Sequence, residues 1–456
     1  MNFKKLLYPA VLIVFSLPVP AQTIEQEALD WLQAFLRVDT INPPGNESRA
    51  VEFLGRILEA EGIPYQTAES APGRGNLWAR LEGGDQPGLI LLNHTDVVPA
   101  DEKYWSTDPL SGEIRDGFLY GRGALDMKGT GISQLATFIS LHRAGVPLNR
   151  DVLFVATADE EAGGFFGAGW LVEHHPEIFD GVGLLINEGG FGVPDGDNVV
   201  FRVEVTQKVP VWLRLTAVDQ PGHGSMPRRQ SAVTRIVTAL HKIHENPFPV
   251  RIVPEVDAMF QGLSKSASGE MAAAFADIAN AAQSPAFLEQ LQSRAPVLHA
   301  LLRDTCSLTR MQGSNKINVV PPEAWAEIDC RILPDRPSEL FVAEIRELLK
   351  DTGVEIEVIM AFTPAISATD TRLYEAIESV TAERHPGSQV QPSVLSGFTD
   401  SHFTRDLGIA SYGFDPMLVD SGEYGGFHGN DERVNVEAFK RGVSDHLAII
   451  QDAVYD

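Results

Sequence analysis

The sequence predicts an α/β fold with a mixed, mostly parallel sheet covered by helices, into which a smaller α+β domain is inserted. Residues 88–98, 151–158 and 181–187 contain short apolar runs without alternation, which is typical of strands buried on both faces. Segments with helical spacing of apolar residues lie between them, and such alternation of strands and helices favours a parallel sheet. Between residues 203 and 362 the pattern changes to polar–apolar alternation, which indicates half-exposed antiparallel strands.

The N-terminal 21 residues have the features of a secretory signal peptide, and we exclude them from the fold. Lys4 and Lys5 precede an apolar stretch that is too short to span a bilayer comfortably, and small residues at 19–21 suit cleavage. No cysteine follows this stretch, so a lipid anchor is not expected, and neither is membrane association of the processed chain. We therefore expect a secreted or periplasmic protein.

The chain is strongly acidic, with 36 Lys and Arg against 62 Asp and Glu and a formal net charge of −26. This negative charge argues against binding to nucleic acid or to an anionic membrane surface. The charge is explained by the need for a soluble surface, and no binding partner is required to account for it. With 44% hydrophobic residues, the 456-residue chain is long enough for more than one domain.

The large domain is expected to comprise residues 22–202 and 363–456. Its first part should begin with two amphipathic helices, the second of which ends at Gly62. Strands and a Gly-rich loop that leads into a helix should follow, and the last part of the chain should return to helix, strand and helix. The segments on which this rests are 23–38, 42–63, 76–83, 88–98, 118–145, 151–164, 181–190, 371–383, 409–416 and 436–454.

The inserted domain is expected to span residues 203–362. Residues 201–218 alternate as one half-exposed strand does, and residues 246–304, which are rich in Ala, Ser, Gln and Leu, form a helical elaboration. The other segments are predicted as helices at 231–246 and 338–353 and as strands at 304–314, 324–334 and 354–362.

Cys306 and Cys330 are the two cysteines of the chain, and their spacing does not resemble a metal-binding motif. In an oxidising compartment they could form a disulfide. They could equally be two small buried apolar side chains, and this second interpretation is the one we favour from the sequence.

Candidate metal ligands follow three apolar segments at the points where the predicted strands end. The ligands of open parallel sheets gather outside the carboxyl ends of the strands. A further acid lies in a Gly-rich loop, where glycine lets the backbone approach a site, and a late histidine lies in another such loop. These candidates are His94 and Asp96, Glu160 and Glu161, Glu188, Asp126, and His428.

Imidazole and carboxylate ligands without cysteine suit zinc, manganese or cobalt in a hydrolytic role. The excess of carboxylates over histidines favours two metal ions, because one carboxylate can bridge both. Asp96 lies two residues after His94, on the same strand face, and suits an acid that accepts the other ring N–H of His94.

With these residues in place, the sequence resembles the aminoacylase, carboxypeptidase S, glutamate carboxypeptidase and succinyl-diaminopimelate desuccinylase family of zinc hydrolases. The resemblance covers about residues 25–450. The sequence departs from the family at Phe398, where relatives usually have a second glycine before Thr399 and Asp400. It also departs in the length of the helical elaboration at residues 246–304, which could change dimerisation. The matching stretches include "HTDVVP", "GRGALDMKG", "ADEEAGG", "NEGG", "GHGSMP", "NVVPPEAWAEIDCRILP", "GFTDSHF" and "HGNDERV".

The resemblance implies two Zn²⁺ ions per chain, with Co²⁺ or Mn²⁺ as possible substitutes. One ion would be held by His94 and Glu188, the other by Glu161 and His428, and Asp126 would bridge them. Glu160 would be the general base, Asp96 would orient His94, and the Asp126–Met127 peptide would be cis.

In relatives the inserted domain is a lid that also serves dimerisation, so a homodimer through this domain is possible. His223 matches a histidine that stabilises the oxyanion, often from a partner subunit. Asn318 and Arg331 match residues near the acyl oxygen and free carboxylate of the substrate, and a planar guanidinium suits a carboxylate.

The predicted function is hydrolysis of amide bonds in small peptides or N-acyl amino acids with a free carboxylate on the leaving side, by a metal-activated water with Glu160 as the base. Two alternatives are a dipeptidase or aminopeptidase on the same metal core and an exported binding protein without activity. The first would need an acid placed to bind a free ammonium group, and the sequence shows no clear candidate. The complete set of predicted ligands, together with Glu160, argues against a binding protein without activity.

Overall fold

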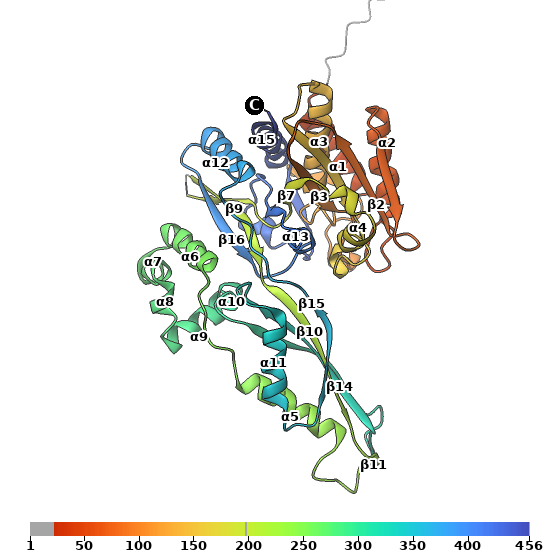
Figure 1. Ribbon diagram of the computed structural model, residues 1–456, viewed down its shortest axis with the longest axis vertical. Coiled ribbons are helices and arrows are strands. Elements are labelled where there is room, and N and C mark those ends of the chain that lie inside the picture. Colours follow the sequence, from red (N-terminus) through yellow and green to blue (C-terminus); the bar gives the residue numbers. More distant parts are fainter. Residues whose placement is uncertain (1–21, 197, 456) are drawn as a thin grey trace, which may run out of the picture.

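The computed structural model describes residues 22–196 and 198–455, so the predicted signal peptide lies outside the described residues. A large domain built on a nine-stranded sheet carries an elongated inserted domain built on a four-stranded sheet (Figure 1). This confirms the predicted α/β class with an inserted α+β domain. None of the described helices is long and apolar enough to cross a membrane.

The sheet of the large domain is mixed. Its central strands β6, β3, β7 and β17 run parallel to one another, and β9 and β16 also pair in parallel, whereas β1, β2 and β8 join antiparallel. In spatial order the strands are β1 (Tyr65–Glu69), β2 (Gly75–Leu81), β6 (Arg150–Thr157), β3 (Gln86–His94), β7 (Val182–Asn187), β17 (Ala410–Gly413), β9 (Asn198–Gln207) and β16 (Gln389–Leu395), with β8 (Gly192–Asp195) beside β9.

Strand β3 explains the apolar run at residues 89–92. Leu89 and Leu91 pack into the larger core on one face of the sheet, and Ile90 and Leu92 pack into a second core on the other face. The prediction of a strand buried on both faces is therefore confirmed. The larger core is covered by α1 (Ile24–Phe35), α2 (Ser48–Ala60), α3 (Lys128–Ala144), α12 (Arg372–Arg384) and α15 (Val436–Val454), and the smaller core by α4 (Ala168–His174).

Short elements complete the large domain. They include a three-stranded sheet of β4 (Glu113–Arg115), β5 (Phe118–Tyr120) and β18 (Arg433–Asn435), the helices α13 (Ser401–Arg405) and α14 (Ser421–Tyr424), and 3₁₀ turns at Glu102–Tyr104, Glu160–Ala162 and Pro176–Ile178.

The inserted domain is an antiparallel sheet with two helices packed on one face. Alternate residues of β10, from Val211 to Ala217, are buried against these helices, as the alternating pattern predicts. The sheet order is β12 (Thr305–Gln312), β14 (Glu323–Ile332), β10 (Val209–Val218) and β15 (Glu355–Ala361); the helices are α5 (Ala232–Glu245) and α11 (Ser338–Leu349), and a small ribbon of β11 (Gly222–His223) and β13 (Val319–Val320) lies at the tip.

The structure differs from the sequence prediction at residues 201–218, which are two strands and not one. β9 belongs to the large sheet and pairs with β16, whereas β10 belongs to the inserted sheet. The change of sheet falls at Lys208, a few residues after the expected boundary at 202–203. Buried Lys208 donates hydrogen bonds to the carbonyls of Ala300 and Arg303 and to the hydroxyl of Thr305, so it ties this link to the elaboration.

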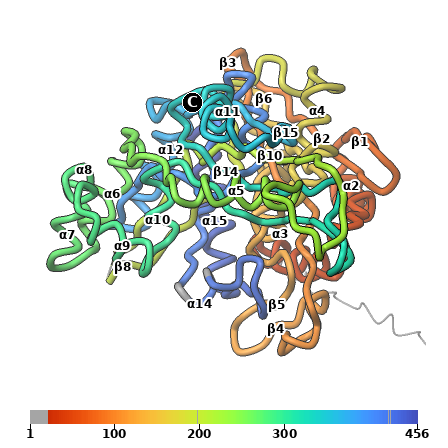
Figure 2. Tube along the Cα trace, turned by 90° about the horizontal axis from the view of Figure 1, so that it is seen from below, coloured from red at the N-terminus to blue at the C-terminus, as the bar shows by residue number. Residues whose placement is uncertain are grey.

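The elaboration at residues 246–304 is helical, as expected, and forms a core of its own. Val394 of strand β16 belongs to the same core, so these helices cover the edge of the large sheet. In Figure 2 they form the side of the molecule opposite α2. The helices are α6 (Pro254–Ser266), α7 (Gly269–Ala276), α8 (Ile278–Ala281), α9 (Pro285–Arg294) and α10 (Pro296–Ala300).

Cys306 and Cys330 form a disulfide between the neighbouring strands β12 and β14, where they are directly opposite each other. The interpretation that we favoured from the sequence, two unpaired buried side chains, is therefore wrong. Sequence spacing carries no information about the register of two strands, and it is this register that brings the two side chains together.

Candidate metal centre

The carboxyl ends of three neighbouring parallel strands bring the first predicted ligands together. His94 is the last residue of β3 and pairs in register with Thr157, the last residue of β6. Glu160 and Glu161 lie in the turn after β6, and Glu188 follows β7 directly. The sheet order β6–β3–β7 therefore places His94 between the two groups of acids.

Asp126 lies at the centre of this group. Its Oδ1 atom is 3.2 Å from His94 Nε2 and its Oδ2 atom is 3.0 Å from His428 Nε2. His94 Nε2 is also 3.4 Å from Glu188 Oε1, and His428 Nε2 is 3.1 Å from Glu161 Oε2. These pairwise contacts link His94 to Glu188 and His428 to Glu161, and both histidines contact Asp126.

Glu160, the predicted general base, is buried beside these sets, with Oε2 3.9 Å from His94 Nε2. Among residues 22–196 and 198–455, two groups have ligand atoms close enough together to hold an ion, and both differ from the predicted ligand sets: His94, Asp126 and Glu161, and His94, Glu160 and Glu188. All five predicted ligands and Glu160 therefore lie together.

Asp96 lies beside the other ring nitrogen of His94, where we expected it, and it has a second set of contacts as well. His94 Nδ1 lies 3.0 Å from the backbone carbonyl of Asp96 and 3.4 Å from its carboxylate. The carboxylate also accepts hydrogen bonds from the backbone N–H groups of Glu160, at 3.1 Å, and Glu161, at 3.3 Å. The backbone of Asp96 thus orients the imidazole, and its side chain fixes the turn that carries both glutamates.

A buried ion-pair network supports the same turn. Arg74 Nη2 lies 2.7 Å from both Glu47 Oε1 and Asp159 Oδ1, and Asp159 Oδ2 accepts the N–H of Phe166 at 3.0 Å. These contacts hold Asp159 at a φ of 71°, in the left-handed region, directly before Glu160. The roles of Glu47 and Arg74 could not be predicted from the sequence, because their pairing with Asp159 joins distant parts of the chain.

Glu432 supports the loop that carries Asp126. Its Oε1 atom accepts the N–H groups of Leu125, at 2.8 Å, and Asp126, at 3.1 Å, and its Oε2 atom pairs with Arg122 at 2.6 Å. The Asp126–Met127 peptide is cis, as the resemblance implied. Glu432 lies in the quoted "HGNDERV" stretch, but no sequence signal separated its role from that of a surface acid.

Negative charge dominates the centre. Burial, followed by the charges of neighbouring acids, raises the pKa of Glu160, of Glu161 and of Glu188, the last to about 8. Hydrogen bonds to Asp126 and Glu161 raise the pKa of His428 to about 10. Glu161 Oε1 is buried and has no hydrogen-bond partner. Crowded, partly unpartnered carboxylates beside two imidazoles fit divalent cations, which would neutralise the charge and take up the free oxygen.

A cavity of about 390 Å³ opens onto these side chains. The rings of Phe191 and Phe427 form one part of its wall, 5.5 Å apart, and Leu395 and Phe398 form another. The site therefore combines a polar floor with apolar walls, as small-molecule sites commonly do.

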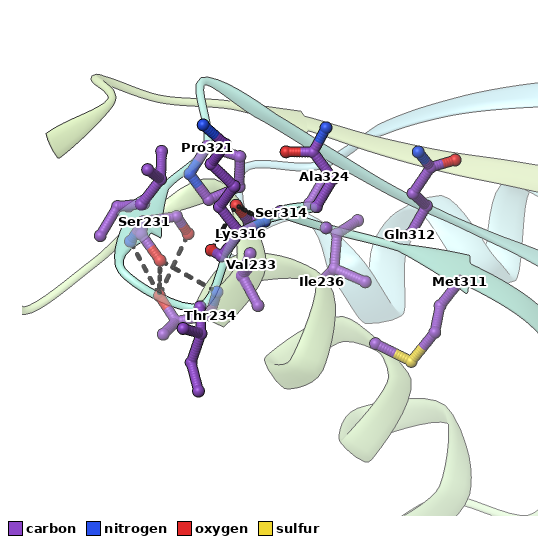
Figure 3. Close-up of a pocket in the computed structure, with 15 residues that line it drawn as sticks. Ser231, Val233, Thr234, Ile236, Met311, Gln312, Ser314, Lys316, Pro321 and Ala324 are labelled. Carbon is purple, nitrogen blue, oxygen red and sulfur yellow. Dashed lines mark hydrogen bonds between the residues drawn. The ribbon is translucent and has the colours of Figure 1, made fainter. Parts of the chain in front are cut away.

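His223 and Asn318 do not join the centre. Both are exposed at the tip of the inserted domain, where Gly224 N–H donates to the Asn318 carbonyl at 2.9 Å, and β11 lies at the far end from the large sheet (Figure 1). Asn318 belongs to the loop between β12 and β14, whose Ser314 and Lys316 lie close to the start of α5 (Figure 3).

Arg331 lies nearer to the centre, on β14. Its Nε and Nη2 atoms bind Asp329, at 2.8 and 3.1 Å, and its guanidinium lies 5.0 Å from the ring centroid of Phe398. Because Phe398 lines the cavity, Arg331 is placed behind the cavity wall. Its buried Nη1 atom has no partner.

The sequence model described as peptidase family M20/M25/M40 matches residues 90–452. The chain belongs to this family. Its M20 relatives include the N-fatty-acyl-amino acid synthase/hydrolase PM20D1 of Xenopus tropicalis, which is 31% identical over 83% of this chain and 75% of that protein. Human aminoacylase-1 is 26% identical over 93% of this chain and 95% of that protein.

Solved structures of the M20 family share the fold. The metallo-carboxypeptidase Sso-CP2 from Sulfolobus solfataricus matches with a TM-score of 0.72 and 18% identity, over 94% of this chain and 99% of that chain. Human carnosine dipeptidase 1 matches with a TM-score of 0.65 and 15% identity, over 94% and 96% of the two chains. Membership shows that this chain is an M20 hydrolase acting on amide bonds of peptides or N-acyl amino acids, in a metal-dependent family.

Proposed function

We propose that this protein is an exported hydrolase of N-acyl amino acids, or of peptides with a free carboxylate on the leaving side, and that it binds two Zn²⁺ ions, with Co²⁺ or Mn²⁺ as substitutes. The observation that carries the proposal is the shared position of Asp126, which contacts His94 through one carboxylate oxygen and His428 through the other. A carboxylate placed in this way suits two cations with a water molecule between them.

The chain's own residues supply the proton transfers. Two cations bound by the predicted ligands would lower the pKa of a water molecule and polarise the amide carbonyl. Glu160 accepts a proton from the attacking water and returns it to the nitrogen of the leaving amine. Burial and the charge of Glu188 raise the pKa of Glu160. The Asp96 carboxylate keeps Glu160 in place through its backbone N–H.

The cavity walls favour a large apolar acyl group on the substrate. Phe191, Phe427 and Phe398 line the same cavity as the predicted ligands, and they would contact an apolar chain. Arg331 does not line this cavity, so its buried Nη1 atom would bind the substrate carboxylate only if the Phe398 ring moves aside. The fatty-acyl group in the name of the PM20D1 relatives supports this substrate class.

Hydrolysis of matched substrates tests this function. We expect turnover of N-dodecanoyl-leucine, weaker turnover of N-acetyl-leucine, and loss of both with a chelator, restored by Zn²⁺. Faster cleavage of free Leu-Leu than of either acyl compound would favour a dipeptidase or aminopeptidase on the same metal core. No turnover of any of them by metal-loaded protein would favour a binding protein.

His223 and Asn318 would act on the substrate only after the inserted domain closes or from a second subunit, because they lie at its far end. We propose a homodimer through this domain. Mixing a Glu160→Gln chain with a His223→Ala chain tests it, since each mixed dimer would hold one complete site. Random mixing should restore about a quarter of wild-type activity. No restoration, with each variant sedimenting as a monomer, would contradict the proposal.

Export rests on residues 1–21 and on the disulfide between Cys306 and Cys330, which is typical of an oxidising compartment. Expression of the full chain in a Gram-negative host, followed by fractionation and mass spectrometry, should find a periplasmic protein that begins after Ala21. An uncleaved cytoplasmic chain would contradict export.

A further inference from the structure

A second cavity lies in the inserted domain, between α5, the helices α9 and α10, and the start of β12. Its volume is about 640 Å³, against about 390 Å³ for the cavity at the metal centre, and the two share no lining residue. This volume lies in the range of cavities that bind small molecules. The proposed mechanism uses none of the residues that line it.

Arg303 supplies an unpaired cation to this cavity. It is half-buried between α10 and β12, and among the described residues its guanidinium forms no ion pair or hydrogen bond. Its Nε atom is buried without a partner, and burial lowers the pKa of the group. A half-buried guanidinium without an acid loses hydration that nothing in the described chain replaces, so an anion in the cavity would be stabilised there.

The groups around Arg303 do not neutralise it. Half-buried His299 lies close enough that the charges of Arg303 and Lys208 add to burial in lowering its pKa. Asp304 follows Arg303, but its carboxylate binds Arg251 at 3.0 Å, Arg336 at 2.6 Å and the N–H of Leu333 at 2.8 Å. Glu289 lies on the rim with an exposed side chain. The polar end of the cavity is therefore positive.

Apolar side chains form much of the remaining wall, which also includes His244, Gln292 and Ser307. Ile243 and Phe248 contribute from the end of α5 and the segment after it, Leu288 from α9, and Leu308 from β12 with 46% of its surface exposed. An alkyl chain lying along these side chains would remove them from water. A cation at one end and an apolar wall along the rest match a molecule with an anionic head and an alkyl chain.

We propose that this cavity binds an amphiphilic carboxylate, with the head group on Arg303 and the chain along Phe248 and Leu288. A free fatty acid and an N-acyl amino acid both have this chemistry. The proposal stands independently of the proposed function, because the metal centre contributes no residue to the cavity.

Calorimetric titration of the full-length processed protein tests the site, with dodecanoate below its micellar concentration as the probe. We expect dodecanoate to bind in the presence of a chelator. The chelator removes any binding of the carboxylate to metal at the catalytic centre, whereas the proposed cavity needs no metal. Arg303→Met should weaken it at least about tenfold by removing the charge while keeping an apolar stem. Leu288→Glu, which places an acid on the apolar wall, should weaken it similarly.

Arg294→Met is the matched control, because Arg294 is exposed on α9 and does not line the cavity. It should bind dodecanoate as wild type does, and all three variants should keep wild-type hydrolysis. N-dodecanoyl-glycine, titrated with the chelator present, distinguishes an acyl amino acid from a fatty acid as the tighter ligand. Unchanged affinity in both Arg303→Met and Leu288→Glu, or equal affinity for neutral dodecanol, would overturn the proposal.

Discussion

Glu432 Oε1 accepts a hydrogen bond from the backbone N–H of Asp126, at 3.1 Å. Glu432 therefore holds the backbone of Asp126, whose side chain contacts both imidazoles of the centre. Glu432 belongs to the same loop as His428. Arg122 pairs with the other oxygen of Glu432, and its charge opposes the rise that burial causes in the pKa of this acid. The geometry of the centre thus depends on contacts outside the ligand set.

Glu432→Gln should weaken metal binding without changing any ligand. A glutamine keeps one acceptor but loses the charged pair with buried Arg122. Loss of a group that positions a ligand typically costs about 10- to 100-fold in metal affinity. Metal content after dialysis against a series of chelator concentrations measures it, with Glu52→Gln on the exposed side of α2 as control. Equal retention of metal in both variants would show that Asp126 does not need this support.

Asp96→Asn should reduce turnover more than it reduces substrate binding. The carboxylate accepts hydrogen bonds from the two backbone N–H groups of Glu160 and Glu161. In asparagine one of the two oxygens is replaced by an NH₂ group, which would face one of these N–H groups and could not accept its hydrogen bond. We expect kcat to fall by about 10- to 100-fold with KM changed little. A change confined to KM would instead assign Asp96 to the substrate.

The stability of the protein should fall as the solution is acidified below pH 6.5, in part through His446. This side chain is fully buried, it shares a hydrogen bond of 2.8 Å with Thr137, and burial lowers its pKa to about 3. Between the folded pKa of about 3 and the ordinary value of 6.5, only the unfolded chain binds this proton, so stability rises with pH in this window.

His446→Leu removes that dependence. The slope contributed by one such group is at most about 1.4 kcal/mol per pH unit. Thermal unfolding midpoints at pH 4.5, 5.5, 6.5 and 7.5 should therefore show a smaller acid-induced fall in the variant than in wild type. Parallel curves for the two proteins would mean that His446 is not a source of the pH dependence.

Reduction of the Cys306–Cys330 disulfide should destabilise the inserted domain and spare the metal centre. The bond closes a loop of 24 residues, for which the chain-entropy account gives about 3 kcal/mol. The Cys306→Ala/Cys330→Ala double variant should unfold at lower denaturant concentration and retain its hydrolytic rate at 25 °C. Unchanged denaturant sensitivity would mean that packing around β12 and β14 alone sets the stability of this domain.

The positions of the predicted metal ligands in the large domain could be foreseen, because each lies at the end of a recognisable strand or in a Gly-rich loop. His94 and Glu188 follow runs buried on both faces, and this placement alone puts their side chains at one edge of the sheet. Asp126 and His428 needed the family resemblance as well, because a loop gives no direction to a side chain. Their contacts with each other appear only in three dimensions.

Other features left no signal in the sequence. Residues 201–218 alternate continuously, yet Lys208 separates two strands of different sheets, because alternation reports burial and not the partner strand. Arg74, Glu47 and Asp159 look like ordinary surface charges until the fold buries them together. The remote position of His223 was likewise unpredictable, since sequence resemblance transfers a residue's identity and not the orientation of its domain.

We propose that Glu160 is the proton acceptor in a centre of two cations that share Asp126. The most direct test is the kcat of metal-loaded Glu160→Gln on N-dodecanoyl-leucine. We predict two metal ions per chain, as in wild type, and a kcat reduced at least about 100-fold, the range of general-base catalysis. A variant that keeps both ions and turns over at the wild-type rate would contradict the account.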